Sequence, residues 1–455
     1  MLAVSCTTKA APLAQTPPMG WNSFDSYGVY LYEDAAMKNL DAFIEKLKPF
    51  GYEYFVIDAG WFGEYRLKEG TIYSKEIHAS ELRFNEYGIL QPSKTYFPNG
   101  FGPLIEKCHA AGLKFGLHLM RGIPKQAVEA NVPIKGTKYH ARDIADTVNI
   151  CSWCPQNYGV DMSKPGAQEF YDSVIAQMAE WGVDFIKYDD IVPHPAEVQA
   201  VVRAIKRCGR PIVLSLSPGG DVKTDAVDIY RQANMLRVTK DIWDEQLGID
   251  NCFAAWEKWQ GTDYPGFWID MDMIPFGQLQ IMAPKPEGLN GNESKGAVRK
   301  MIESGELDDI ALFCGKGWHR WCQLSHDQMR TFITLRALSA SPLMVGGDLP
   351  SMDDFSLSLL TNSDILACNQ NGVMGKLQYR DGSVDVWKTD RKAGKGGWIG
   401  IFNRSEKDQT VELTPEQIGL EGSGDYDIYD VFNAGNVQTL VFQIPANGVR
   451  FLKYK

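Results

Sequence analysis

Two short segments end in carboxylates directly after apolar runs that are typical of buried strands. The first is Lys187-Tyr-Asp189-Asp190, and the second is Arg237-Val-Thr-Lys-Asp241. Residues two apart on a strand share a face, so Lys187 points the same way as Asp189, and its positive charge favours the ionised carboxylate that a nucleophile requires. Asp241 supplies a second carboxyl group that can donate a proton. The pair predicts glycoside chemistry.

Two carboxyl groups about 5 to 5.5 Å apart favour a retaining mechanism, in which one attacks the anomeric carbon while the other protonates the leaving oxygen. An isolated Lys-x-Asp is usually an ordinary ion pair, so the rest of the chain must support this interpretation. Most of the strand-like runs end in acids, and stability alone does not explain that clustering. The acids are Asp58, Asp189 with Asp190, Asp270 with Asp272, Asp348, and Asp241 just beyond its run.

Apolar or β-branched runs alternate with amphipathic stretches over most of the chain, which predicts an α/β fold. Eight such runs predict a (β/α)₈ TIM barrel, whose active site lies where the strands end. The expected strands cover 18–24, 54–58, 114–120, 185–190, 212–217, 235–239, 267–272 and 343–348. The clearest expected helices cover 35–50, 102–111, 167–181, 196–208 and 326–341.

The pattern changes after Asn369 to short alternating runs broken by Gly, Asn and Asp. It predicts a catalytic barrel over 17–369 and a C-terminal antiparallel β-sandwich over 370–455. The sandwich has no acidic cluster, so we expect an accessory role for it. A Pro/Gly/Asn-rich stretch after the seventh strand predicts an insertion over about 278–324, which either shapes a subsite or is a passive surface feature.

The composition is that of a globular protein with a large core: 455 residues, 44% hydrophobic and 23% charged. A net charge of −11 disfavours nucleic acid and anionic membranes as partners, and a small neutral carbohydrate fits better. No apolar run reaches the roughly 18 residues of a membrane-spanning helix. We expect no cofactor and no metal. Cys151 and Cys154 form a CxxC pair without further zinc ligands nearby.

The first residues, Met1-Leu-Ala-Val-Ser-Cys6, are similar to the end of a bacterial lipoprotein signal. A Pro/Ala/Thr-rich tether follows, so that residues 1–16 lie outside the predicted barrel. This pattern predicts an exported protein in the periplasm or at the cell surface of a bacterium.

Six motifs in order resemble those of the glycoside hydrolase family 27 α-galactosidases and α-N-acetylgalactosaminidases, over about 17–370. They are Pro17-Pro-Met-Gly-Trp-Asn-Ser-Phe, Val56-Ile-Asp-Ala-Gly-Trp, Phe185-Ile-Lys-Tyr-Asp-Asp, Arg237-Val-Thr-Lys-Asp-Ile-Trp-Asp, Trp268-Ile-Asp-Met-Asp-Met and Ala340-Ser-Pro-Leu-Met-Val-Gly-Gly-Asp-Leu. The resemblance implies that Asp189 is the nucleophile and Asp241 the acid/base. It also implies that the sugar pocket is lined by Trp21, Asp58, Lys187, Arg237 and Asp272.

The chain departs from the family pattern at three places. Ala59 replaces a second sugar-binding acid, and Ile191 stands where relatives carry a cysteine, which leaves Cys151 without its expected disulfide partner. The third strand ends in a segment with His118 and Arg121 in place of the usual tyrosine-bearing sequence. These two side chains either replace missing sugar contacts or have ordinary structural roles. Arg237 likewise either contacts the sugar or serves as an ion-pair partner, and Asp58 either contacts the sugar or caps its loop.

The resemblance also bears on the sugar. Galactosidases tend to place a Glu and a larger apolar residue after the fifth strand, whereas N-acetylgalactosaminidases place a Ser and a small residue there. This chain has Ser215-Leu-Ser217-Pro218-Gly219-Gly220, which leaves room for an acetamido group, so Ser217 is a predicted substrate contact. We expect an α-galactosidase with relaxed choice at carbon 2, and relaxed choice at carbon 4 stays open as well. The alternatives are an α-N-acetylgalactosaminidase and a hydrolase of β-L-arabinopyranosides or α-glucosides.

Two hypotheses from other classes stay open on the sequence. A barrel rich in carboxylates can bind Mg²⁺ or Mn²⁺ and catalyse metal-dependent hydrolysis or isomerisation. A sugar-binding barrel that has lost catalysis is the other possibility, with Ala59 as its first sign. Sensitivity to a chelator would separate the metal enzyme from the glycosidase.

Overall fold

The structure is a computed structural model that describes residues 13–455 except 75, 219–221, 223, 263, 292, 308–312 and 422–425. In this described part, eight parallel strands form one sheet in the order β12-β11-β10-β9-β5-β2-β1-β15. They are β1 (Met19–Asn22), β2 (Tyr54–Ile57), β5 (Lys114–Met120), β9 (Phe185–Asp189), β10 (Val213–Leu216), β11 (Met235–Arg237), β12 (Trp268–Asp270) and β15 (Leu343–Val345).

The sheet closes just beyond β12. Ile274 N donates to Met344 O at 2.8 Å, and Gly346 N donates to Ile274 O at 2.9 Å, so the segment after β12 pairs in parallel with β15. Each strand lies within one of the eight predicted runs, and the predicted barrel is confirmed. All carboxyl ends of its strands therefore meet at one rim.

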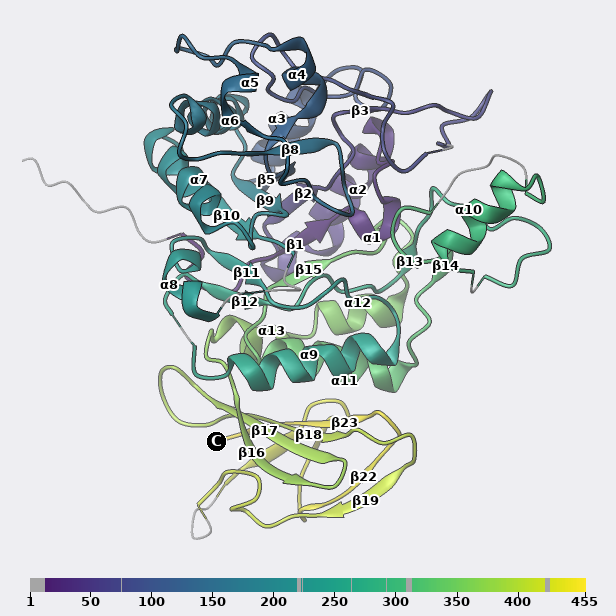
Figure 1. Cartoon of the computed structure of the whole chain (residues 1–455). Helices are drawn as coiled ribbons and strands as arrows, with labels where there is room; N and C mark the ends of the chain where they lie inside the picture. Colours follow the sequence, from purple (N-terminus) through teal and green to yellow (C-terminus); the bar gives the residue numbers. More distant parts are fainter. Residues whose placement is uncertain are drawn as a thin grey trace, which may run out of the picture.

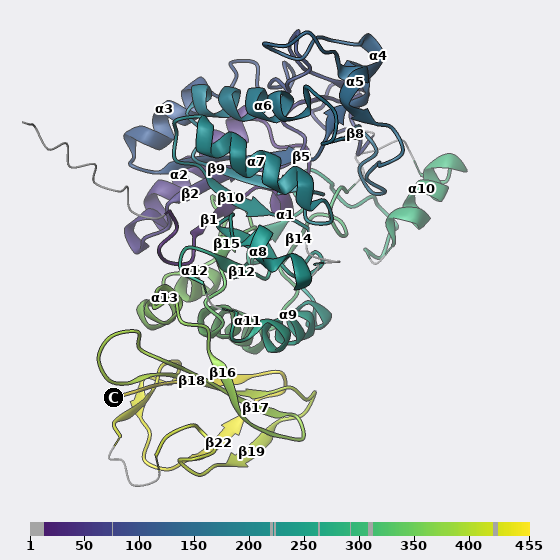
Figure 2. The ribbon, with the colours of Figure 1, turned by 60° about the vertical axis from the view of Figure 1, so that its left-hand side comes forward.

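Helices cover the outside of the barrel (Figures 1 and 2). They bury an apolar stripe against the strands, as the periodicity predicts. The predicted helices correspond to α2 (Glu33–Lys46), α3 (Gly102–Ala110), α6 (Ala167–Trp181), α7 (Pro195–Arg207) and α11 (His326–Leu338). Shorter or unpredicted elements are α1 (Phe24–Tyr27), η1 (Lys48–Phe50), η2 (Thr224–Ala226), α8 (Val227–Tyr230), α9 (Gln246–Trp259), α12 (Asp354–Leu360) and α13 (Ser363–Gln370).

Short additional strands and helices follow several of the barrel strands. After β2 come β3 (Gly63–Glu64) and β4 (Glu81–Leu82), and after β5 come β6 (Ile123–Pro124), α4 (Lys125–Ala130), α5 (Ala141–Ile144), β7 (Ala145–Asp146) and β8 (Asn157–Val160). The predicted insertion after β12 contains β13 (Gln278–Leu279), α10 (Lys295–Glu303) and β14 (Arg320–Trp321). Its α10 projects from the barrel in Figure 1 and has a small core of its own with Val298, Phe313 and Trp318.

The C-terminal strands form the predicted antiparallel β-sandwich. In the described part, one sheet has the order β16-β17-β18-β23-β20-β21 and a second pairs β19 with β22. Apolar side chains from both sheets, such as Ile399, Leu452 and Ile444, meet in one core. The strands are β16 (Lys376–Asp381), β17 (Val384–Asp390), β18 (Gly397–Asn403), β19 (Gln409–Glu412), β20 (Ile428–Asp430), β21 (Gly435–Asn436), β22 (Val441–Ile444) and β23 (Val449–Tyr454).

Helices α9 and α11 lie between the barrel and the sandwich (Figure 1). Trp256 of α9 stacks on Trp387 of β17 with ring centroids 3.8 Å apart, and its indole N–H donates to Gly375 O at 2.9 Å. The side chains of α11 from Thr331 to Leu338 are buried, because this helix packs against barrel elements on one side and β17, β18 and β23 on the other. The barrel core therefore extends onto the face of the C-terminal sheet that meets these helices, whereas the interior of the sandwich forms a separate cluster.

Two predictions concern the N-terminal tether and the cysteines. Most of the predicted tether lies outside the described residues, so export of the protein stays a prediction. No disulfide joins any of the cysteines in the described part, and Cys151 and Cys154 are both free thiols, in line with the missing partner at Ile191. Among the described helices, none is both long and apolar enough to cross a membrane.

We predict that Trp256→Ala lowers the free energy of unfolding by about 3 to 5 kcal/mol, the usual cost of truncating a buried Trp. The side chain is fully buried at the junction, and its loss leaves a cavity beside Trp387. Urea denaturation followed by fluorescence and circular dichroism measures this change. The control is Trp153→Ala, since Trp153 is 49% exposed and its removal should cost little. Equal stability of the two variants would contradict the prediction.

Candidate active site

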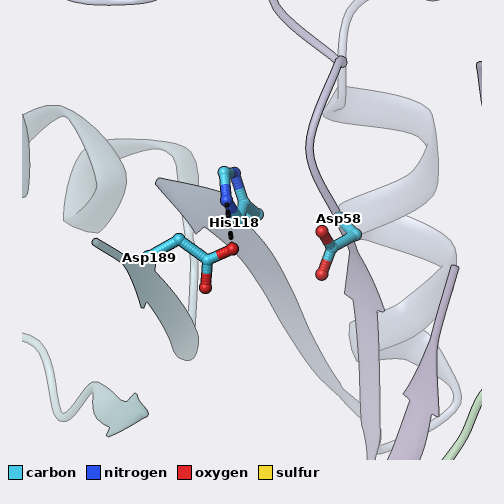
Figure 3. Close-up of side chains that lie close together, drawn as sticks. All are labelled: Asp58, His118 and Asp189. Carbon is cyan, nitrogen blue, oxygen red and sulfur yellow. Dashed lines mark ion pairs between the residues drawn. The ribbon is translucent and has the colours of Figure 1, made fainter. Parts of the chain in front are cut away.

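Three buried side chains meet at the carboxyl ends of β2, β5 and β9 (Figure 3). Asp58 directly follows β2, His118 belongs to β5, and Asp189 ends β9. The imidazole Nε2 of His118 lies 3.1 Å from Asp189 Oδ2. His118 is the parallel register partner of Lys187, so the pairing of β5 with β9 brings its ring beside the carboxylate two residues further on.

Lys187 places a positive charge between the two acids. Its Nζ lies 2.8 Å from Asp58 Oδ2 and 3.8 Å from Asp189 Oδ2. Burial of the ammonium opposes its charge, but the carboxylates of Asp189 and Asp58 outweigh this effect and raise the pKa of Lys187 well above its ordinary value. The predicted shared face of Lys187 and Asp189 is thus present, and the cation stays protonated at any working pH.

Asp189 has the electrostatic character that a nucleophile requires. Burial opposes its ionisation, but Lys187 and then His118 outweigh burial, so the pKa of Asp189 lies well below its ordinary value. Its Oδ1 is buried and has no hydrogen-bond partner among the described residues. The carboxylate is therefore ionised, held through Oδ2 and, within the described part of the chain, unpaired at Oδ1.

Asp58 has partners at both oxygens. Oδ2 accepts from Asn22 Nδ2 at 2.7 Å and from Lys187 Nζ at 2.8 Å, and Oδ1 accepts from Ala59 N at 2.8 Å. Burial opposes ionisation of Asp58, but the charge of Lys187 outweighs it, and the pKa of Asp58 is lowered. The bond to Ala59 N shows that Asp58 caps its own turn, and Oδ1 keeps a second lone pair that can accept a sugar hydroxyl.

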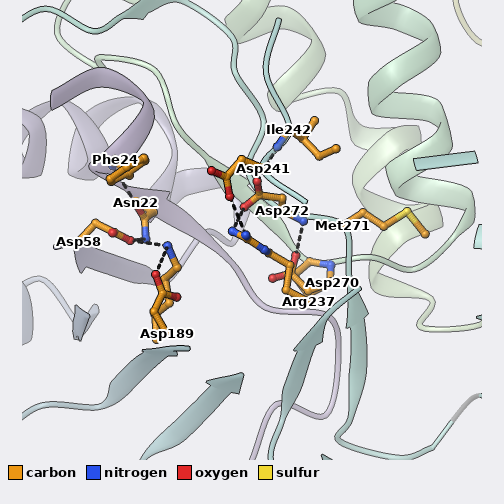
Figure 4. Close-up of polar contacts among 12 residues, drawn as sticks. Asn22, Phe24, Asp58, Asp189, Arg237, Asp241, Ile242, Asp270, Met271 and Asp272 are labelled. Atoms are coloured by element: carbon orange, nitrogen blue, oxygen red, sulfur yellow. Dashed lines mark hydrogen bonds and ion pairs between the residues drawn. The ribbon is translucent and has the colours of Figure 1, made fainter. Parts of the chain in front are cut away.

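A second group of polar side chains gathers at the ends of β11 and β12 (Figure 4). Arg237 Nη2 donates to Asp241 Oδ1 at 2.7 Å, and Arg237 Nη1 donates to Asp272 Oδ1 at 3.0 Å. The other oxygen of Asp272 accepts from Ile242 N at 2.8 Å. Arg237 is therefore the ion-pair partner of both acids. It is also close enough to Asp189 to help lower the pKa of that carboxyl.

Asp241 and Asp272 differ in exposure. The Asp241 side chain is 62% exposed, whereas that of Asp272 is 5% exposed. Asp272 also adopts a left-handed backbone with φ of 74°, a conformation that non-glycine residues keep only when their surroundings impose it. Asp272 thus holds Arg237 and the loop after β11, while Asp241 is the carboxyl group that solvent and substrate can reach.

Trp21 does not line the pocket, and this prediction is wrong. Its side chain is fully buried, its indole N–H donates to Gly347 O at 2.8 Å, and its ring stacks on Phe55. Neighbouring residues of a strand face opposite sides, so when Asn22 contacts Asp58, Trp21 must face the helix layer. The aromatic ring beside the site is Phe24, at the start of α1 and 5.7 Å from Lys187 Nζ.

Arg121 likewise has a structural role. Its guanidinium donates to Asp190 Oδ2 and to Glu197 Oε1, each at 2.9 Å, and so ties the end of β9 to α7. Asp348, another acid at a strand end, accepts from Tyr27 Oη at 2.6 Å and is anchored away from the nucleophile. Of the two side chains predicted as possible replacements for missing contacts, only His118 reaches a predicted catalytic residue.

Ser217 lies directly after β10, beside the strand that carries Asp189. Ser217 N donates to Tyr188 O at 3.0 Å, and its buried hydroxyl has no hydrogen-bond partner among the described residues. An unpaired buried hydroxyl is costly, so a ligand group that bonds to it would gain free energy. Gly219 and Gly220, which complete the predicted small-residue pocket, lie outside the described residues.

The donor atoms of Asp58, His118 and Asp189 lie within 4.8 Å of one another, a spacing that suits a metal ion. The ammonium of Lys187, however, already contacts Asp58 and faces Asp189. A divalent cation would meet this fixed positive charge at close range, which is strongly unfavourable in a buried site. The residues present therefore do not fit a metal centre.

Comparison with known proteins agrees with this geometry. The family model described as alpha galactosidase A matches residues 156–286. An α-galactosidase of Cyamopsis tetragonoloba is 26% identical over 441 residues, which cover 94% of this chain and 82% of that protein. The crystal structure of a family 27 β-L-arabinopyranosidase from Geobacillus stearothermophilus is 37% identical, covers 97% of both chains and has a TM-score of 0.83.

The chain belongs to glycoside hydrolase family 27. A structure named as a putative α-N-acetylgalactosaminidase of Bacillus halodurans is also similar, with 33% identity, a TM-score of 0.79 and coverage of 97% of this chain and 98% of that one. The protein is accordingly a retaining glycoside hydrolase that acts on carbohydrate.

We predict that Lys187→Met shifts the acid limb of kcat/KM to higher pH. Activity requires ionised Asp189, and without the ammonium the burial of this carboxyl raises its pKa, so activity is lost at a higher pH than in the natural protein. A pH profile of kcat/KM measures the shift. Lys114→Met is the matched control, because Lys114 pairs with Glu53 in an exposed position and should leave the profile unchanged. An unmoved acid limb in Lys187→Met would show that another group sets it.

Proposed function

We propose that this family 27 member hydrolyses terminal sugars of galactose-type ring configuration with retention, with Asp189 as nucleophile and Asp241 as acid/base. The observation that carries the proposal is the state of Asp189: an ionised carboxylate, held by Lys187 and His118 at one oxygen and unpaired at the other. Such a group is suited to attack on an anomeric carbon.

The two steps follow from the side chains at the rim. Asp189 Oδ1 attacks the anomeric carbon while Asp241 gives its proton to the glycosidic oxygen, and the aglycone leaves. A water molecule then loses a proton to Asp241 and attacks the glycosyl carbon, which releases Asp189 as a carboxylate. Exposure of Asp241 allows it to reach both the leaving oxygen and the incoming water. Its bond to Arg237 sets its orientation.

The similar proteins support the ring configuration. They are named as α-galactosidases, a β-L-arabinopyranosidase and a putative α-N-acetylgalactosaminidase. β-L-Arabinopyranose has the ring stereochemistry of α-D-galactopyranose and lacks only the exocyclic CH₂OH. By resemblance, Ala59 replaces an acid that helps to recognise ring hydroxyls, and a site with one polar partner fewer discriminates less. We therefore propose α-galactosidase activity that tolerates changes at carbon 2 and the loss of the CH₂OH group.

We predict that the α-galactoside and the β-L-arabinopyranoside have kcat/KM values within about two hundredfold of each other, because one lost contact in a pocket is worth about 1 to 3 kcal/mol. The α-N-acetylgalactosaminide should also be hydrolysed, since Ser217 and its neighbours are small. The α-glucoside should be about ten thousandfold poorer than the α-galactoside, because its inverted 4-hydroxyl leaves polar groups of the site unpaired. Rates on the four p-nitrophenyl glycosides test this. Turnover of the α-glucoside alone would contradict the galactose-type assignment.

We predict that Asp189→Ala and Asp241→Ala each lower kcat by at least about a thousandfold, the scale expected for a lost nucleophile or acid. Azide distinguishes the two roles. It should rescue Asp189→Ala by direct displacement to a β-glycosyl azide, and rescue Asp241→Ala by attack on the covalent intermediate to an α-glycosyl azide.

Product anomers are identified by NMR in this experiment. Asp228→Ala is the control, since Asp228 is 95% exposed on α8 and should retain full activity. Full activity of Asp189→Ala on an aryl α-galactoside would remove the nucleophile assignment.

A further inference from the structure

The insertion between β12 and β15 binds the loop that carries Asp241. Arg320 of β14 donates from Nε to Asp244 Oδ2 at 3.0 Å and from Nη2 to Asp244 Oδ1, a paired arrangement that only a guanidinium forms with a carboxylate. Gln323 N, also in the insertion, donates to the same Asp244 Oδ2 at 3.0 Å. Asp244 lies three residues after Asp241.

The remaining donors of Arg320 are directed back to the insertion itself. Nη1 donates to Lys316 O at 2.7 Å and to Trp318 O at 3.1 Å. These bonds orient the guanidinium toward Asp244. The Asp244 side chain is only 3% exposed, so the loss of Arg320 would leave a buried carboxylate without its cation, which is costly.

Trp243 fills the space between the loop and the insertion. It is buried, and the guanidinium of Arg320 lies 5.8 Å from its ring. The insertion backbone comes so close at Gly315 that a Cβ atom there would lie 2.2 Å from the Trp243 ring. Only glycine permits this approach. The insertion and the loop are thus packed together as well as paired.

The loop is held at two points directly after Asp241. Asp272 Oδ2 accepts from Ile242 N at 2.8 Å, and Arg320 holds Asp244 two residues later. Arg237 holds the Asp241 carboxyl group itself. We propose that Arg320 is a positioning residue for the acid/base, and that the insertion is a structural support of the catalytic loop. This inference rests on the proposed role of Asp241.

Loss of such support has a specific kinetic signature. Proton transfer to the leaving oxygen depends on the position of the acid, and a displacement of about 1 Å can reduce a rate about a hundredfold. An aglycone that forms a stable anion, such as 2,4-dinitrophenolate, leaves without receiving a proton. An alcohol aglycone must be protonated as it leaves, because an alkoxide is a poor leaving group. Misplaced Asp241 therefore slows glycosides with alcohol aglycones and spares dinitrophenyl glycosides in the first step.

The test compares kcat/KM of methyl and 2,4-dinitrophenyl α-galactosides in Arg320→Gln and Arg320→Lys. We expect Arg320→Gln to lose about 10- to 100-fold on the methyl glycoside and less than about threefold on the dinitrophenyl glycoside. Arg320→Lys, which retains the charge without the paired donors, should lie between Arg320→Gln and the natural protein and remains informative if Arg320→Gln does not fold.

Arg330→Gln is the matched control, since Arg330 lies on α11 with an ion pair to Asp327 and does not contact the loop. Asp241→Ala is measured alongside. The acid/base assignment stands if Asp241→Ala loses much more activity on the methyl glycoside than on the dinitrophenyl glycoside. In that case, equal losses on both substrates in the Arg320 variants, or no loss on either, would overturn only the positioning role of Arg320. Absence of that dependence in Asp241→Ala would overturn the acid/base assignment and the role of Arg320 with it.

Discussion

The site depends on one buried cation. Asp58 and Asp189 are taken out of water at neighbouring positions of the rim, and burial alone would protonate them. The ammonium of Lys187 keeps both ionised, and it lies on the same strand as Asp189. A change that removed this one charge would alter both acids together. The parallel pairing of β2, β5 and β9 fixes the distances between these side chains. The strength of their charge interactions therefore depends on the closed barrel.

Arg237 has a similar role at the ends of β11 and β12, where it forms ion pairs with Asp241 and Asp272. Even when Asp241 carries the proton that it donates, the carboxylates of Asp58, Asp189 and Asp272 lie beside Lys187 and Arg237 at the rim. Glycoside cleavage develops positive charge on the sugar ring, so the ionised carboxylate of Asp189 favours the transition state over a neutral substrate.

The strands and the acids were predictable from the sequence for separate reasons. Runs such as 54–58 and 185–190 combine β-branched and aromatic residues with a terminal Asp. This pattern can be recognised from the local sequence without knowledge of the fold. Trp21 was misplaced because an aromatic residue near a strand end resembles a sugar platform, and only the pairing of Asn22 with Asp58 shows which face turns inward. His118 and Arg320 depend on contacts between segments far apart in sequence, which periodicity does not encode.

The helix α11 limits how far the two domains can be treated as exchangeable modules. Its guanidinium Arg336 is fully buried and donates to Asp272 O and to Pro342 O, while the opposite side of the helix supports the C-terminal sheet. Displacement of the sandwich would therefore reach Asp272, and through it Arg237 and Asp241. A recombination event that exchanged the C-terminal sheet for another would have to preserve the surface that meets α11, so barrel and sandwich are expected to be inherited as one unit.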